Sequence, residues 1–263
     1  MKLAVIGSRK YPNDYNWMHK YLDRLLYSHY TKPQEIVTII SGGAKGVDTY
    51  AKEYARFFKF EYQEYFPEYD KYEGKHACIL RNIEIVKNAD RVLAFWDGSS
   101  KGTEFVINEC KKQNKPCDIV RTPIFVYTDG SATTHQNTGG WAYTVVHNDI
   151  DLVQGSGGEL NATNNQMELM AAVQGLMWVN TQTWNYDYPI VLVTDSEYVI
   201  NQGLKNHKTN TNHNLVHALQ FGFEHLKVLP VHVYGHTGDK YNELVNKLAN
   251  EKRLEYDRMK NEK

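Results

Sequence analysis

Residues 126–131 read Val-Tyr-Thr-Asp-Gly-Ser, and residues 192–196 read Leu-Val-Thr-Asp-Ser. In each stretch an apolar run typical of a buried strand ends at an aspartate, Asp129 in the first and Asp195 in the second. If the two strands are neighbours, the carboxylates lie close enough to repel, and one takes up a proton unless a cation neutralises them. A hard divalent ion such as Mg²⁺ prefers carboxylate oxygen. The two stretches therefore predict a metal site beyond the ends of two strands of one sheet.

A third acid, Glu168, lies within residues 163–172, which read Thr-Asn-Asn-Gln-Met-Glu-Leu-Met-Ala-Ala. Apolar residues recur there at helical spacing. We expect a helix over 166–180, with Asn165 as a possible cap and Glu168 in the first turn. Taken singly, each acid has an ordinary explanation, because aspartates form turns and a glutamate is favourable near a helix N-terminus. Only the three acids together indicate a functional site.

Length and pattern predict two domains. The chain has 263 residues, 41% of them hydrophobic and 23% charged, which is typical of a soluble globular protein with more than one domain. In the first half, strand patterns are expected over 3–6, 36–40, 60–65, 92–95 and 118–120. Helical patterns alternate with them over 17–27, 47–58, 78–87 and 103–112. This alternation predicts a Rossmann-like, doubly wound parallel sheet. We place the boundary where a meander of strands begins, which gives domains over 1–121 and 122–263.

Four motifs of the second domain occur together. They are Thr-Asp-Gly-Ser at 128–131, Thr-Asn-Asn leading to Glu168, Thr-Asp-Ser at 194–196, and Gly-His-Thr-Gly at 235–238 followed by Asn-Glu at 242–243. In order and spacing they resemble the type I ribonuclease H family over nearly all of residues 124–255. The resemblance implies a mixed five-stranded sheet with flanking helices. It also implies two-metal hydrolysis of the RNA strand of RNA·DNA hybrids, which leaves a 5′-phosphate and a 3′-hydroxyl.

The same resemblance assigns roles to residues of this chain. Asp129, Glu168 and Asp195 resemble the metal ligands, with two Mg²⁺ or Mn²⁺ ions expected. His236 resembles a mobile histidine that assists proton movement and product release. Contacts to the nucleic acid are implied for Thr163, Asn164, Asn165 and Glu197.

Two positions depart from the family pattern. Asn246 stands where the family has a fourth catalytic and metal-binding acid. An amide offers a metal a carbonyl oxygen but no charge, so we expect a working enzyme with one weakened metal site. The alternative is a nucleotide sensor that binds a hybrid without cleaving it. Glu197 stands where a glutamine usually contacts the minor groove, and a carboxylate there can accept a hydrogen bond but cannot donate one.

Charge is distributed unevenly along the chain. Residues 1–121 contain 20 Lys and Arg against 16 Asp and Glu, a net of +4, whereas residues 122–263 contain 10 against 15, a net of −5. Nucleic-acid-binding surfaces normally carry Lys and Arg. We therefore expect the second domain to bind a hybrid weakly by itself, with the first domain or a partner contributing to the grip.

Neither the apolar runs nor the cysteines of the sequence are those expected of a membrane or secreted protein. No apolar run is long enough to cross a bilayer, and the short apolar stretch after Met1 reads as a first strand rather than a signal peptide. Cys78, Cys110 and Cys117 show no paired spacing. Reduced thiols in a cytoplasmic protein are the expectation.

Glycine-containing loops follow three strands of the first domain. They read Gly-Ser-Arg at 7–9, Ser-Gly-Gly-Ala-Lys-Gly-Val-Asp at 41–48, and Asp-Gly-Ser-Ser-Lys-Gly-Thr-Glu at 97–104. Each lies between a strand end and a helix start, where backbone amides bind phosphate in open α/β sheets. One such loop is usually an ordinary tight turn. Three at one edge favour a nucleotide-binding site.

Together with Arg-Asn at 81–82, these loops resemble the SLOG superfamily, in its YspA/YpsA-like branch, over residues 1–121. The resemblance implies a nucleotide or nucleotide-derived ligand. The candidate contacts are Ser8, Arg9, Gly42, Gly43, Arg81, Gly102 and Thr103. Relatives in another branch hydrolyse nucleoside monophosphates with an arginine and a glutamate, for which Arg81 and Glu104 are the candidates. The loop at 97–104 lacks that branch's signature, so we favour binding over catalysis here.

Overall fold

A computed structural model describes residues 1–11, 15–29, 38–133, 137–183, 187–208, 211–235 and 238–262. The chain divides into two compact units, Met1–Thr122 and Pro123–Lys263, and each is described by itself. Within the described residues, no helix is both long and apolar enough to span a membrane.

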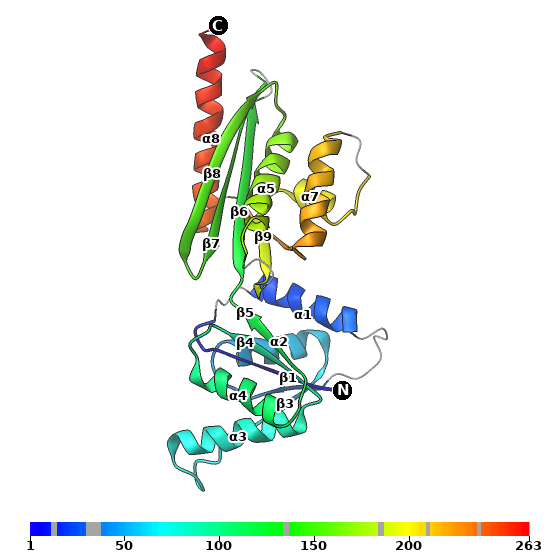
Figure 1. Cartoon of the computed structure of the whole chain (residues 1–263), viewed down its shortest axis with the longest axis vertical. Helices are drawn as coiled ribbons and strands as arrows, with labels where there is room; N and C mark the ends of the chain where they lie inside the picture. The colour runs from blue at the N-terminus through cyan, green and yellow to red at the C-terminus, as the bar shows by residue number, and fades with distance from the viewer. Residues whose placement is uncertain are drawn as a thin grey trace. The chain divides into compact units, whose positions relative to one another are not determined.

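The first unit is a five-stranded parallel sheet in the order β3-β2-β1-β4-β5. Its strands are β1 (Lys2–Gly7), β2 (Thr38–Ser41), β3 (Glu61–Glu64), β4 (Arg91–Trp96) and β5 (Cys117–Arg121). Its helices are α1 (Tyr15–His29), α2 (Val47–Phe58), α3 (Gly74–Asn88) and α4 (Lys101–Lys112). Strands and helices alternate along the chain, and the predicted doubly wound arrangement is confirmed (Figure 1).

Both faces of this sheet are covered by apolar packing. Along β4, Ala94 belongs to a core cluster that also includes Ile85 of α3 and Val106 of α4. The next residue, Phe95, contacts the ring of Trp17 in α1, with ring centroids 6.1 Å apart. Because successive strand residues point to opposite faces, this alternation places helices on both sides of the sheet.

The second unit is a mixed five-stranded sheet in the order β10-β9-β6-β7-β8. Its strands are β6 (Ile124–Thr133), β7 (Thr138–His147), β8 (Ile150–Leu160), β9 (Ile190–Thr194) and β10 (Leu229–His232). Its helices are α5 (Asn164–Asn180), α6 (Glu197–Gly203), α7 (His213–His225) and α8 (Lys240–Asn261). Strands β6, β7 and β8 pair antiparallel, while β9 runs parallel to both β6 and β10. The mixed sheet with flanking helices agrees with the expectation.

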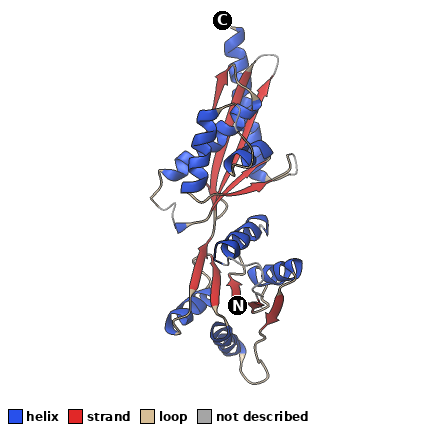
Figure 2. Cartoon of the chain, turned by 90° about the vertical axis from the view of Figure 1, so that its right-hand side faces the viewer, coloured by secondary structure: helices blue, strands red, loops and turns tan. Residues whose placement is uncertain are grey.

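Helices cover both faces of this second sheet as well. Helix α5 packs on one face, and α8 runs along the opposite face (Figures 1 and 2). The α5 side contains the main core, including Val126, Leu192 and Leu176. The α8 side contains a smaller cluster built on Val245 and Ala249.

Two boundaries differ from the expectation in ways that matter for the site. Strand β6 does not end at Thr128 but continues to Thr133, because residues 129–133 pair with β7 in a long hairpin. Helix α5 begins at Asn164, and its cap is Thr163, whose side chain accepts a hydrogen bond from the Gln166 N–H; Asn165 is not the cap. Glu168 therefore lies in the second turn of α5 and not in the first.

Candidate active site

Asp129 lies within strand β6 and not at its end. Asp129 pairs with Ala142 of β7, so its side chain leaves a face of the sheet rather than its end, which corrects the expectation of a strand-terminal acid. Val126 faces the α5 side, whereas Tyr127 packs with the cluster on the α8 side. The two-residue period of a strand then places Asp129 and Ser131 on the same face as Tyr127.

Gly130 allows α5 to approach β6 closely enough to bring Glu168 to this site. A Cβ atom on Gly130 would lie 2.2 Å from the Glu168 backbone nitrogen and 2.5 Å from the Met167 carbonyl carbon. Such separations do not permit a side chain. The residue next to Asp129 in sequence is therefore in direct contact with the backbone of the second acid.

Strand β9 supplies the third acid. Tyr127 of β6 is in register with Val193 of β9, and Asp129 and Asp195 each lie two residues beyond that pair. Asp195 precedes Ser196, whose side chain caps α6 by accepting from the Val199 N–H. A Cβ on Gly235 would lie 3.1 Å from Asp195 Oδ2, so the loop after β10 begins beside this carboxylate.

The three acids converge in space. Asp129, Glu168 and Asp195 each place a carboxylate oxygen within 4.8 Å of the others. Asp129 and Glu168 are both 6% exposed, and Asp195 is half-buried. Burial and then the charge of Asp195 raise the pKa of Asp129 to about 7, against a hydrogen bond from the Gly130 N–H. Burial, followed by the charges of Asp129 and Asp195, also holds the pKa of Glu168 well above its usual value.

This arrangement fits a divalent cation. Within the described part of the chain, Glu168 Oε2 is buried without a hydrogen-bond partner. The other oxygen, Oε1, accepts from Asn164 Nδ2 at 3.4 Å. An unsatisfied buried oxygen among mutually repelling carboxylates is stabilised by a cation and costs free energy without one. Mg²⁺ and Mn²⁺ are the hard ions that such an all-oxygen donor set suits.

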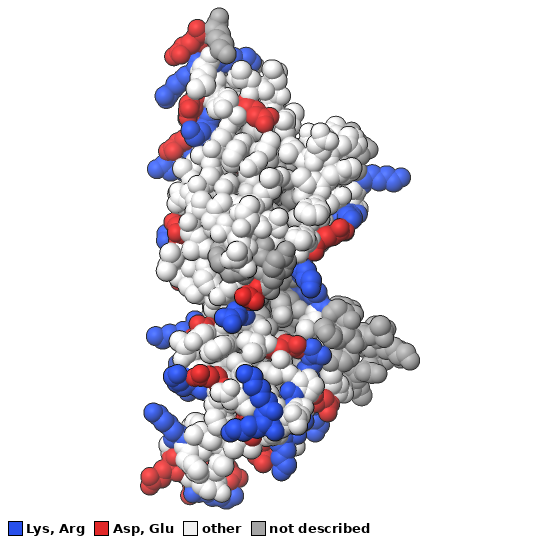
Figure 3. Space-filling model, in the orientation of Figure 1, with Lys and Arg blue, Asp and Glu red and all other residues white. Residues whose placement is uncertain are grey.

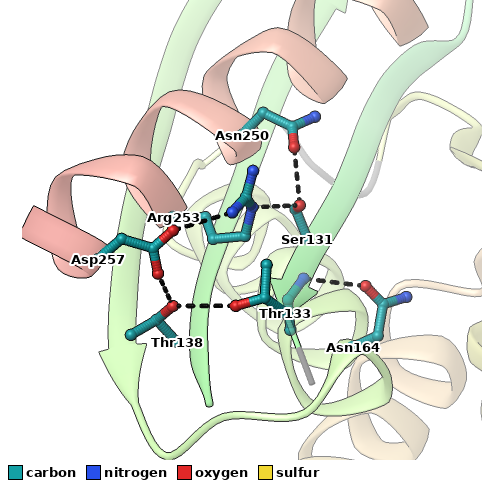
Figure 4. Close-up of polar contacts among 8 residues, drawn as sticks. Ser131, Thr133, Thr138, Asn164, Asn250, Arg253 and Asp257 are labelled. Atoms are coloured by element: carbon teal, nitrogen blue, oxygen red, sulfur yellow. Dashed lines mark hydrogen bonds and ion pairs between the residues drawn. The ribbon is translucent and has the colours of Figure 1, made fainter. Parts of the chain in front are cut away.

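Asn246 lies level with Asp129. Helix α8 runs beside β6 in the same direction, because Asn250 bonds to Ser131 and, further along, Asp257 bonds to Thr138 at the far end of the β6–β7 hairpin (Figure 4). Asn246 precedes Asn250 by one helical turn, about 5.4 Å. Asp129 precedes Ser131 by two strand residues, about 6.8 Å. Asn246, the residue expected at the fourth position of the site, therefore lies about level with Asp129 along β6 and α8.

The residues expected to contact nucleic acid are exposed at the start of two helices. Thr163, Asn164 and Asn165 lie at the N-terminus of α5, and Glu197 lies at that of α6. Asn164 has structural contacts that the sequence did not reveal. Its Oδ1 accepts from the Ala132 N–H at 3.1 Å (Figure 4). Its Nδ2 donates to Glu168 Oε1 at 3.4 Å. His236 lies outside the described residues.

The glycine loops of the first unit surround a cavity of about 440 Å³. Of the residues expected to bind a nucleotide, five line it: Arg9, Gly42, Arg81, Gly102 and Thr103. Ser8 is fully buried, with its Oγ 3.4 Å from Thr103 Oγ. Gly43 is exposed, with a left-handed φ of 68°.

A buried acid in this cavity escaped the sequence analysis. Asp48 of α2 is 5% exposed and accepts a hydrogen bond from the Ala44 N–H at 3.1 Å. Burial raises its pKa to about 6, against hydrogen bonds from backbone N–H groups and the charge of Arg81. Arg81 in turn donates to the carbonyl oxygens of Gly42 and Tyr65. The strand-to-helix position of Asp48 was visible in the sequence, but its burial was not.

Comparison with known proteins bears on both units. The RNase H family model matches residues 121–253, and the model of the YspA, cpYpsA-related SLOG family matches residues 1–72. Ribonuclease H of Pseudomonas paraeruginosa (strain DSM 24068 / PA7) is 36% identical over 140 residues, which cover 48% of this chain and 90% of that protein. Ribonuclease H of Orientia tsutsugamushi (strain Boryong) is 31% identical over 157 residues, covering 54% of this chain and 89% of that protein.

Two solved structures are also similar to the chain. LC11-RNase H1, isolated from compost, has a TM-score of 0.43 at 21% identity and covers 51% of this chain and 97% of its own. RNase H1 from the halophilic archaeon Halobacterium salinarum NRC-1 has a TM-score of 0.42 at 25% identity and covers 51% of this chain and 98% of its own.

The carboxylate cluster on a mixed sheet and the sequence matches together place the second unit in the class of hydrolytic nucleases. The chain belongs to the ribonuclease H family, which confirms the resemblance carried by the four motifs. It is an enzyme of the ribonuclease H type. The SLOG resemblance of the first unit is likewise confirmed, over residues 1–72.

Proposed function

We propose that residues 122–263 form a domain that hydrolyses the RNA strand of RNA·DNA hybrids with divalent ions held by Asp129, Glu168 and Asp195. The observation that carries this proposal is the convergence of the three carboxylates within 4.8 Å. Burial, followed by repulsion among them, raises the pKa values of Asp129 and Glu168. The relatives named ribonuclease H, matched over about nine-tenths of their own length, support the same substrate class.

Each residue of the site has a part in this proposal. The chemistry that bound Mg²⁺ or Mn²⁺ supplies is activation of the attacking water and stabilisation of the leaving 3′-oxygen, giving a 5′-phosphate product. Glu168 is held beside Asp129 by the Gly130 contact and by Asn164. His236 follows Gly235, which lies beside Asp195, and we assign it to proton movement and product release.

Recognition of the hybrid is assigned to the exposed helix starts. Thr163 and Asn165 are exposed on α5, and Glu197 is exposed on α6. We propose that Thr163 contacts a DNA phosphate, while Asn164, Asn165 and Glu197 contact the minor groove. The 2′-hydroxyl distinguishes RNA from DNA at such a site.

The negative net charge of this domain favours weak binding of the hybrid. Its net charge is −5, from 10 Lys and Arg against 15 Asp and Glu. On the face shown in Figure 3, charged side chains of both signs gather along α8. There Lys247 pairs with Glu251, and Lys252 pairs with Glu255. Such paired charges leave little net attraction for phosphate.

An end-labelled hybrid incubated with the full chain in Mg²⁺ or Mn²⁺ tests the proposal. We expect cleavage of the RNA strand, with duplex DNA left intact. Asp129→Asn should abolish cleavage, because it removes the charge at the centre of the cluster. A protein that binds the hybrid but cuts it in neither metal would contradict the proposal and support a non-cleaving binding protein.

A second function is proposed for residues 1–121, which we infer to be a separate domain that binds a nucleotide or nucleotide-derived ligand. The observation that favours it is the cavity where the loops after β1, β2 and β4 meet. Arg9 and Arg81 supply positive charge there, and Gly102 and Thr103 lie at the N-terminus of α4, where backbone amides and the helix dipole favour phosphate.

Calorimetric titration of nucleoside mono-, di- and triphosphates into the full chain tests this second function. We expect binding that Arg9→Ala weakens by about tenfold, the loss of one charge-assisted contact. Analysis of the titrated nucleotides separates binding from hydrolysis. Glu104, the candidate catalytic glutamate, does not line the cavity, which favours binding alone. Absence of binding to every nucleotide would contradict the assignment.

A further inference from the structure

A chain of hydrogen bonds leads from α8 through β6 to Asn246. Arg253 Nε lies 3.2 Å from Ser131 Oγ, and Ser131 Oγ lies 2.8 Å from Asn250 Oδ1 (Figure 4). Asn250 Nδ2 then contacts two oxygens of Asn246, Oδ1 at 2.8 Å and the backbone carbonyl at 3.0 Å. The chain thus ends on the side chain that stands in place of the family's fourth acid.

The direction of this chain is set by the groups at its two ends. An arginine can only donate hydrogen bonds, and Arg253 is held in place by Asp257, 3.0 Å from its Nη1. Ser131 Oγ accepts from Arg253 and donates its own hydrogen to Asn250 Oδ1. At the other end, the backbone carbonyl of Asn246 can only accept, so Asn250 directs its NH₂ group to Asn246, whose Oδ1 accepts from it as well. A hydrogen-bond network of this kind is what distinguishes oxygen from nitrogen in an amide.

This direction has a consequence for metal binding. An amide binds a cation through its carbonyl oxygen, because its nitrogen carries only hydrogens. In Asn246 that oxygen is turned onto Asn250, and a metal ion would have to share it with a donated N–H. An aspartate in this position could accept from Asn250 with one oxygen and still offer the other.

We propose that Asn250 is a positioning residue that keeps the Asn246 oxygen away from divalent ions, so that the three carboxylates bind them without help from position 246. This inference rests on the proposed metal site. It attributes the weakness of one ion site to the direction of a hydrogen-bond chain as well as to the missing charge. Reversing the chain should therefore recruit Asn246 as a ligand.

Asn250→Asp reverses the chain, because a carboxylate only accepts hydrogen bonds. Asn246 must then donate its NH₂ group to position 250 and turn its oxygen to the other side. Mn²⁺ binding to the substrate-free full chain, followed by the electron paramagnetic resonance signal of free Mn²⁺, measures the effect. We expect Asn250→Asp to tighten binding by about tenfold, the scale on which outer partners of metal ligands act. Asn246→Asp, which adds charge and an oxygen, should tighten it further.

Asn246→Ala separates ligation from the added negative charge. Alone, it should change Mn²⁺ affinity less than about twofold, because the oxygen it removes is not used. Combined with Asn250→Asp, it should remove most of the tenfold gain. An equal gain with and without Asn246 would mean that charge alone acts, and the proposal would be wrong. A large loss of affinity in Asn246→Ala alone would equally overturn it, because the oxygen would already be a ligand.

Two further measurements keep this test separate from that of the metal site. Asp129→Asn should abolish Mn²⁺ binding in every background; if it does not, the carboxylate site itself is misassigned. Ser131→Ala removes the hydrogen that Asn250 Oδ1 accepts, while the amides and the contact with the Asn246 backbone carbonyl are preserved. It should produce a smaller gain than Asn250→Asp, again dependent on Asn246. Thermal unfolding of each variant confirms that it remains folded.

Discussion

Asp129 in β6 and Asp48 in α2 are both buried aspartates. Both have a raised pKa, about 7 for Asp129 and about 6 for Asp48. Their surroundings differ. Asp48 accepts a hydrogen bond from the Ala44 N–H and lies near the positive charge of Arg81. Asp129 faces two other carboxylates. The protein itself supplies partners for the first acid, whereas the second lies among like charges, so it takes up a proton or, as we propose, binds a cation from solution.

The largest effect expected from this difference is on catalysis. Glu168→Gln keeps the shape of the side chain but removes its charge from the cluster. We expect hybrid cleavage to fall by at least about a hundredfold. Asp48→Asn, the matched change in the other unit, should leave cleavage unchanged. Initial rates on a labelled hybrid in Mg²⁺ measure both, and a similar loss in both variants would contradict the distinction.

A second comparison concerns two glycines. Gly130→Ala would place a Cβ 2.2 Å from the Glu168 backbone nitrogen. We expect it to cost about 1–3 kcal/mol of stability or more, because α5 must shift, and to reduce cleavage strongly. A Cβ on Gly102 meets no atom of the described residues within 4 Å.

Gly102→Ala is therefore the matched control, and it should be near neutral in stability. Urea unfolding and cleavage rates distinguish the two substitutions. If Gly130→Ala unfolds and cuts like the unchanged protein, the close contact of α5 with β6 is not present in solution.

The third prediction concerns pH in the absence of metal. The folded-state pKa of Asp129, about 7, lies above its usual value of 3.8. The folded protein therefore binds more protons than the unfolded chain between those values, and it loses stability as pH rises through them. Asp129→Asn should remove this loss and stabilise the metal-free protein by up to about 4 kcal/mol at pH 8, with little effect at pH 4.

Adding Mg²⁺ then distinguishes the effect of Asp129 on stability from that of Asp48. It should restore stability at pH 8 in the unchanged protein but not in Asp129→Asn. The loss caused by the raised pKa of Asp48 should persist with or without the ion. Thermal unfolding at pH 4 and pH 8, in chelator and in Mg²⁺, gives the four conditions needed. An equal response of Asp129→Asn and the unchanged protein to Mg²⁺ would contradict the ligand assignment.

The smallest effect is expected at the helix caps. Thr163 caps α5 at the metal site, and Ser100 caps α4 at the cavity. Each substitution to alanine should cost about 1 kcal/mol of unfolding free energy, since one N–H loses its partner. Because α5 carries Glu168, only Thr163→Ala should also lower cleavage. Equal cleavage by the two variants would show that the cap does not position the acid.

Sequence reasoning succeeded where a local pattern decides the structure. Helix α2 was expected over 47–58 and is observed there, because its apolar periodicity is unbroken and Gly46 precedes it. The extension of β6 beyond Thr128 was missed, since it depends on pairing with β7 and residues 129–133 carry little apolar signal. The cap of α5 was placed two residues late because asparagine and threonine are both good caps.

The candidate site was predictable to the extent that motifs mark it. Asp129, Glu168 and Asp195 each lie in a short motif, and the structure brings the three together. Ser131 belongs to the first of these motifs, but its contact with Asn250 has no sequence signal, because it joins residues 119 positions apart. The burial of Asp48 depends in the same way on tertiary packing. Long-range contacts and burial are the properties that a local pattern does not encode.

The contact between Gly130 and the backbone of α5 has a practical consequence for anyone redesigning this enzyme. A library that randomises the whole Thr-Asp-Gly-Ser stretch would consist mostly of members with a displaced helix, whatever else they carried. Asn165 and Glu197 are better positions to vary, because their side chains are exposed at helix starts and neither caps its helix. Position 130 should stay fixed in any such campaign, because the spacing between two of the three acids is built on the absence of a side chain there.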